Sequence, residues 1–251
     1  MTAPPGQRLP PGHALFARYA FPPNELGYCG PADADVLLRG DNAGEVAAHA
    51  IQFDGAWPYL RAIAEAAGIN DTLSGEVVGT YWVGGPLLNR VEPGPLLDRL
   101  RSAFAGQVTG LLADVDDPSG VLAHHSFHVF VVYPWVRFLG RNPTTALQVM
   151  QNCRIRWGTV VSVDDEYVVM ASRPLTLLAG LLGLGEPTNE RVRWSRDGES
   201  LISAPAPGDT VSAHWDWICS TLAEAETDAL AAATRTTLGL VNSARERRRD
   251  R

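Results

Sequence analysis

The sequence contains no lysine, so arginine carries every permanent positive side-chain charge. Its 21 basic residues stand against 28 aspartates and glutamates, which gives a formal net charge of -7. Proteins that bind nucleic acid through its phosphates need clustered cations. This charge balance therefore argues against nucleic acid as the main partner.

Long apolar runs are also missing. No run approaches the ~18 residues that a membrane-spanning helix needs, and the N-terminus lacks the cationic-then-apolar order of a secretory signal. The three cysteines, Cys29, Cys153 and Cys219, are an odd number at wide spacing and form no CxxC pair or disulfide framework. We therefore expect a cytoplasmic protein with reduced thiols and no membrane span.

Hydrophobic residues make up 45% of the 251 positions and charged residues 20%, as in ordinary globular proteins. After an irregular arm rich in proline and glycine (residues 1–12), apolar positions recur at helical spacing as far as about residue 150. Residues 21–31 are expected to form an ordered loop, because their prolines and glycines oppose a helix. Residues 1–150 are thus predicted to be a helical bundle behind the irregular arm. The expected helices cover residues 44–68 (two helices), 77–83, 95–112, 126–139 and 144–151.

At Cys153 the apolar period changes from helical spacing to alternation, which is typical of strands. A Leu/Gly-rich stretch at 175–185 is expected to be a flexible connection, and an Ala-rich helix is expected from about 220 to 247. Residues 151–251 are therefore predicted to form a small five-stranded OB-like β-barrel with a C-terminal helix, which makes the whole chain α+β. The expected strands are 155–163, 167–171, 191–194, 200–203 and 210–215.

Two short motifs in this second part resemble a known family. Residues 153–160 read Cys-Arg-Ile-Arg-Trp-Gly-Thr-Val, and residues 208–214 read Gly-Asp-Thr-Val-Ser-Ala-His before a helix. The pairing resembles the HypC/HupF family of nickel–iron hydrogenase maturation chaperones, over about residues 153–242. In that family a cysteine begins the first strand, and a Gly-Asp-x-Val-x-x-His strand precedes a C-terminal helix.

The resemblance implies that Cys153 and His214 hold an iron fragment transiently while it is delivered to the hydrogenase large subunit. A thiolate and a neutral imidazole are suitable ligands for such iron and leave other coordination positions open. The implied function is an accessory or maturation factor that recognises a large-subunit precursor or a maturation partner. It requires both side chains to meet at an accessible rim of the barrel.

Departures from the family leave other interpretations open. About 150 residues precede Cys153, and Trp157 stands where the family has proline. A metal-free protein-interaction module that keeps only the docking surface would explain both features. In that case Cys153 is a small buried hydrophobic residue and His214 an imidazole bonded to backbone.

A run of histidines supplies a second candidate metal site. Three of the six histidines, His124, His125 and His128, lie within five residues. On a helix, His124 and His128 would share a face and could hold one metal ion. The alternative function is therefore a metal-dependent hydrolase or lyase that uses these three histidines, although His125 replaces the glutamate that a His-Glu-x-x-His peptidase needs. Histidines bonded to backbone at a helix start are the structural alternative.

Overall fold

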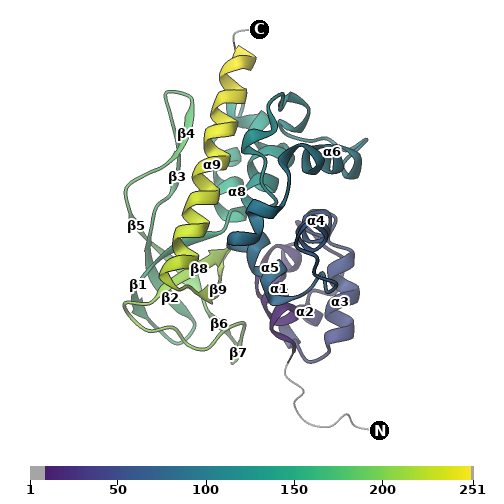
Figure 1. Ribbon diagram of the computed structural model, residues 1–251. Coiled ribbons are helices and arrows are strands. Elements are labelled where there is room, and N and C mark those ends of the chain that lie inside the picture. Colours follow the sequence, from purple (N-terminus) through teal and green to yellow (C-terminus); the bar gives the residue numbers. More distant parts are fainter. Residues whose placement is uncertain (1–8, 250–251) are drawn as a thin grey trace.

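The computed structural model describes residues 9–249, and Figure 1 shows their arrangement. Helices and short helical turns precede the strands, and a long helix closes the chain. The α-helices are α1 (Pro11–Glu25), α2 (Asp35–Arg39), α3 (Ala43–Ile51), α4 (Trp57–Ala67), α5 (Gly75–Trp82), α6 (Pro93–Ala103), α7 (His125–Phe127), α8 (Pro143–Cys153) and α9 (Glu224–Arg249). The 3-10 turns are η1 (Pro86–Arg90), η2 (Leu112–Asp114), η3 (Pro118–Gly120) and η5 (Pro134–Gly140), and the π-helical turn is η4 (His128–Val132).

Nine strands follow α8 among the described residues. They are β1 (Arg156–Val163), β2 (Tyr167–Ser172), β3 (Leu175–Leu178), β4 (Leu181–Leu184), β5 (Thr188–Arg193), β6 (Ser195–Arg196), β7 (Glu199–Ser200), β8 (Thr210–His214) and β9 (Trp217–Thr221). Five of them form one sheet in the order β1-β2-β5-β9-β8, and β8 also pairs with β1. The sheet is mixed, because β5 and β9 run parallel while the other pairs are antiparallel.

The chain is α+β as expected, but the predicted architecture, a helical bundle followed by an OB-like β-barrel, is wrong. The structure has a mixed five-stranded sheet, two further two-stranded sheets, and helices spread along the chain. Strand β9, whose Trp217, Ile218 and Cys219 are all buried, was not expected. A strand was also expected at 200–203, but only Ser200 belongs to a strand there, as the end of the two-residue β7 that pairs with β6. The strand that completes the sheet is therefore β9, inserted between β5 and β8.

Two segments expected to be irregular are ordered elements. Helix α1 includes Pro22 and Pro23, so the expected loop at 21–31 begins only after Glu25. Both prolines lie in the last turn, where their carbonyls accept hydrogen bonds from the amides of Leu26 and Tyr28. The helix therefore ends with satisfied acceptors despite its prolines. The irregular arm expected at 1–12 lies mostly outside the described residues, and α1 already begins at Pro11.

The Leu/Gly-rich stretch, expected to be a flexible connection, forms the β3–β4 hairpin. Ala179 and Gly180 make its two-residue turn with φ of 50° and 83°, which matches the backbone that such turns need. Helix α9 holds the hairpin in place, because the Asn242 side chain accepts from the Leu182 amide at 2.8 Å and donates to its carbonyl at 2.9 Å.

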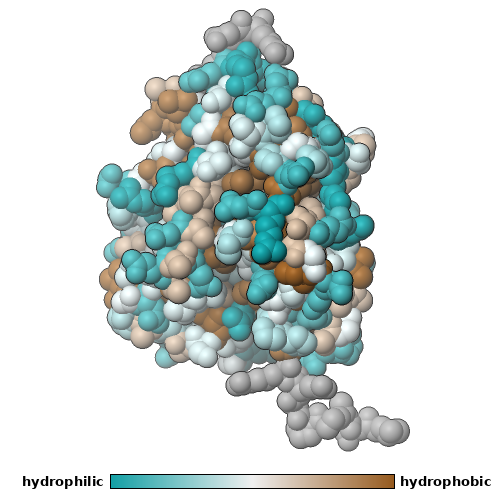
Figure 2. Space-filling model, in the orientation of Figure 1, coloured by the Kyte–Doolittle hydropathy of each residue, from teal (hydrophilic) through white to brown (hydrophobic). Residues whose placement is uncertain are grey.

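One hydrophobic core runs from α1 to α9. Helix α9 contacts α7, η3, η4 and β4, so it touches both the helical part and the strands (Figure 1). Helix α1 in turn contacts β8 and β9. The face drawn in Figure 2 mixes hydrophilic and hydrophobic residues. No helix within residues 9–249 is both long and apolar enough to span a bilayer.

Candidate metal centre

Three potential ligands from distant parts of the chain meet between the helices and the sheet. His125 is the first residue of α7, Cys153 the last of α8, and His214 the last of β8. One ligand atom from each residue lies within 4.8 Å of the other two. We call these three residues the ligand group. It contains both residues that the resemblance identified, Cys153 and His214, together with a histidine of the 124–128 run.

His214 is oriented by α1. The Nδ1 atom of His214 lies 2.6 Å from the backbone carbonyl of Tyr19, which fixes that nitrogen as the proton donor because a carbonyl only accepts. The Nε2 atom is buried and has no hydrogen-bond partner. A buried nitrogen with a free lone pair is what a metal-ligating imidazole presents, while its other nitrogen is held by backbone.

His125 is held from both sides. Its Nε2 lies 2.8 Å from the Cys153 carbonyl, and its Nδ1 lies 3.1 Å from the Tyr81 hydroxyl. Since the carbonyl accepts, the proton of the neutral ring is on Nε2, and Nδ1 is left as an acceptor. The single proton of the Tyr81 hydroxyl faces both Nδ1 and the Gly55 carbonyl, which is also 3.1 Å away. Ligation through either nitrogen of His125 therefore displaces one of its contacts, with Cys153 or with Tyr81.

The group is buried rather than open. His214 is 1% exposed, His125 5% and Cys153 7%. The indole of Trp82 packs against both imidazoles, with ring centroids 4.6 Å from His125 and 5.5 Å from His214. The two side chains were expected to meet at an accessible rim of the barrel; that expectation is wrong, because Cys153 and His214 meet in the interior.

Burial controls the charge of the group. It raises the pKa of the Cys153 thiol, with a further rise from Cys29, and lowers the pKa of His125 to about 4. The pKa of His214 is lowered well below its ordinary value, first by burial and then by the nearby His125. Without a metal all three side chains are therefore neutral at pH 7. A bound cation would supply the positive charge that favours the thiolate.

His124 and His128 are not members of the ligand group. Helix α7 begins only at His125, and the π-helical turn η4 begins at His128, so His124 and His128 are not on successive turns of one α-helix. His124 is the N-cap of α7, and its Nδ1 accepts from the Ser126 amide at 3.0 Å. The His128 ring packs among aromatic rings, including Tyr59 at 5.8 Å.

The residues of the group fit a transition metal. One sulfur and two imidazole nitrogens suit zinc or iron, and three protein ligands leave a coordination position open. His125 was expected to act only with its sequence neighbours, and its place beside Cys153 and His214 was not foreseen. Nothing in the local pattern shows that α7 packs beside α8 and β8.

Almost the whole chain matches one known family. Residues 8–248 match the model of a family described as a family of unknown function, DUF6390. The chain belongs to the DUF6390 family. No curated protein and no solved structure matches the chain. Nothing in these comparisons links this DUF6390 protein to the HypC/HupF family.

Proposed function

We propose that this protein binds iron through His125, Cys153 and His214, and that it acts as an accessory factor in the maturation of a nickel–iron hydrogenase. The observation that carries the proposal is the convergence of three ligand atoms within 4.8 Å of one another from α7, α8 and β8. These residues lie far apart in the sequence, so local chain geometry does not explain why they meet. A group that could hold a metal is thus present in the fold itself.

The choice of metal and process rests on the resemblance. Cys153 and His214 are the residues that match the iron-holding cysteine and histidine of the HypC/HupF family. His125 adds a third donor, so the group offers a thiolate and two imidazoles, which are ligands that iron accepts. A third ligand also makes retention stronger than a two-residue grip would.

Burial defines how such a protein would work. A metal held by residues that are at most 7% exposed does not exchange freely with solvent. Release to a partner therefore has to pass the side chains that separate the group from the surface. This favours a factor that keeps its metal until it meets the correct protein.

The first experiment measures bound metal. Wild-type protein is stripped with a chelator, reloaded anaerobically with Fe(II), desalted and analysed for iron. We expect one iron per chain in the wild type and loss of iron in Cys153→Ala and His214→Ala. Cys29→Ser is the matched thiol control and should keep its iron, because Cys29 is outside the ligand group and reloading is carried to equilibrium. Equal iron in Cys153→Ala and wild type would overturn the site assignment.

The second experiment tests the accessory role separately. A hydrogenase large-subunit precursor, expressed with the tagged chain, should co-purify with it. Metal binding without any such complex would leave the metal site standing and reject the maturation role. A chain that binds the precursor but no metal would instead fit the metal-free interaction module.

A second candidate, a metal-dependent hydrolase or lyase, is favoured by one observation. A surface pocket of about 380 Å³ is lined in part by His128, whose ring lies 6.3 Å from that of His125. Catalytic zinc sites likewise combine three protein ligands with an open position near a pocket. Zinc or manganese in place of iron, with metal-dependent hydrolysis that is lost in His125→Ala, would select this function.

A further inference from the structure

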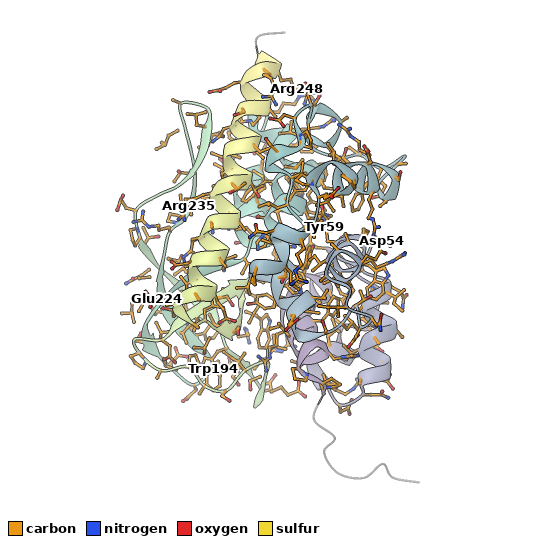
Figure 3. All side chains as sticks on the ribbon, in the orientation of Figure 1. Asp54, Tyr59, Trp194, Glu224, Arg235 and Arg248 are labelled. Carbon is orange, nitrogen blue, oxygen red and sulfur yellow. The ribbon has the colours of Figure 1, made fainter. Side chains whose placement is uncertain are left out.

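The pocket beside His128 lies at the surface, next to the buried ligand group. We call it the His128 pocket. Its outer wall includes Gln107 and Val108, which are exposed, and its inner wall includes His128 and Gly55. Figure 3 labels Asp54, another lining residue, and Tyr59, whose ring contacts His128 edge-on; both lie among the helices.

Two contacts join this pocket to His125, and each passes through a single side chain. The rings of His128 and His125 are nearly parallel, with an interplanar angle of 23° and centroids 6.3 Å apart. The second contact runs through Tyr81, whose hydroxyl lies 3.1 Å from the Gly55 carbonyl and 3.1 Å from His125 Nδ1. The inner wall of the pocket is thus the outer wall of the ligand group.

The lining of the pocket offers metal donors. The lining residues include Cys29, Asp54 and His128, whose side chains carry a thiol, a carboxylate and an imidazole. The Nδ1 atom of His128 is buried and has no hydrogen-bond partner. His128 thus lines the pocket, its ring lies 6.3 Å from that of His125, and it carries a nitrogen without a partner that can take a cation.

We propose that metal reaches the His125–Cys153–His214 group through the His128 pocket, with His128 as the transfer ligand at its inner wall. The inference rests on the proposed metal site and adds the route by which that site is filled. A buried group needs such a route, because an ion that leaves water must exchange its hydration shell for protein donors step by step. His128 supplies the intermediate donor in that exchange.

The route predicts an effect on rates and not on affinity. Chelator-stripped protein is mixed with Co(II) in a stopped-flow instrument, and the thiolate-to-cobalt absorption reports arrival at Cys153. His128→Phe keeps an aromatic ring but removes the nitrogen donor. Because transfer in both directions passes His128, uptake and release should slow severalfold together, and the dissociation constant should stay unchanged.

Gly55→Ala tests the same route without altering a donor. A Cβ at Gly55 would lie 2.8 Å from His128 Nε2, so the imidazole has to shift away from its place at the inner wall. We expect slower cobalt uptake at unchanged affinity. The matched control is Gly239→Ala in α9, where a Cβ meets nothing within 4 Å and uptake should remain at the wild-type rate.

The outcomes separate this inference from the proposed function. A wild type that shows no thiolate-to-cobalt absorption overturns the metal site and the route together. Wild-type binding at Cys153 with unchanged uptake rates in His128→Phe and Gly55→Ala overturns the route alone. A weaker affinity at an unchanged uptake rate also overturns it, because His128 would then act at equilibrium and not in transfer.

Discussion

His124 and His125 are adjacent in the sequence, but their side chains serve different parts of the molecule. His125 turns toward Cys153 and His214 and completes the ligand group. His124 caps α7, and its Nδ1 lies 2.8 Å from the Ser126 hydroxyl, which in turn contacts Thr237 of α9 at 3.0 Å. A dense run of histidines therefore contributes only one residue, His125, to the ligand group. Convergence with distant residues, and not local density, defines the candidate site.

The surroundings of His124 and of His125 are both buried. The largest effect is expected from a change of pH, which tests this burial. Burial lowers the pKa of His124 and His128 to about 3 and that of His125 to about 4, against an ordinary value of 6.5. Above pH 6.5 these rings are neutral in both the folded and the unfolded chain. Below it the unfolded chain takes up protons that the folded chain refuses until about pH 4, so stability falls as pH falls through this window.

We therefore expect the metal-free protein to lose several kcal/mol of unfolding free energy between about pH 7 and about pH 5, at roughly 2 kcal/mol for each histidine. Urea titrations at the two pH values, followed by tryptophan fluorescence, measure the difference. The double variant His124→Asn/His128→Phe should show a smaller pH dependence. Equal unfolding free energies at both pH values would show that these histidines are solvated in the folded protein.

Metal affinity distinguishes His125, which belongs to the ligand group, from its neighbour His124, which does not. His125→Ala removes a ligand and should weaken metal binding more than about 100-fold, since loss of a residue that only orients a ligand already costs 10–100-fold. His124→Ala removes no ligand and should leave the affinity within a fewfold of wild type. Competition titration with a chromophoric chelator measures both variants. Equal losses in the two variants would mean that the whole histidine run, and not His125, governs binding.

The candidate site could be predicted only in part from the sequence. The two motifs selected Cys153 and His214 because each stands in a recognisable local pattern. The expected pairing of His124 with His128 assumed a continuous α-helix, whereas a cap at His124 and a π-helical turn at His128 interrupt it. The position of His125 beside Cys153 depends on how α7, α8 and β8 pack, which no local spacing encodes.

The fold divides in the same way. The change of period after Cys153 and the turn residues between segments correctly located β1, β2, β5 and β8, because polar–apolar alternation and turns are local signals in the sequence. β9 was missed because Trp217, Ile218 and Cys219 are consecutive buried residues and do not alternate. A strand buried on both faces shows no period of two, so only its partners β5 and β8 reveal it.

The stability of the His124 environment provides a smaller test. His124→Ala removes the acceptor of the Ser126 amide, which would then be buried without a partner. We expect a loss of about 1–3 kcal/mol in unfolding free energy at about pH 8, measured by urea titration of metal-free protein. His124→Asn is the matched variant, because asparagine is a preferred N-cap and should keep most of that hydrogen bond. Equal losses in both variants would locate the effect in ring packing instead.

The smallest change in unfolding free energy is expected at Thr237 of α9, the last residue in the chain of contacts that runs from His124 through Ser126. The Thr237 hydroxyl contacts Ser126 Oγ at 3.0 Å and donates to the Ala233 carbonyl at 2.9 Å, and the residue is fully buried. Thr237→Val keeps the shape and removes both contacts, and Ser126 retains its contact with His124. We expect a loss of about 1 kcal/mol in unfolding free energy and an unchanged metal affinity. If Thr237→Val weakened metal binding, the His124 environment would be coupled to the ligand group, and the two neighbouring histidines would act together after all.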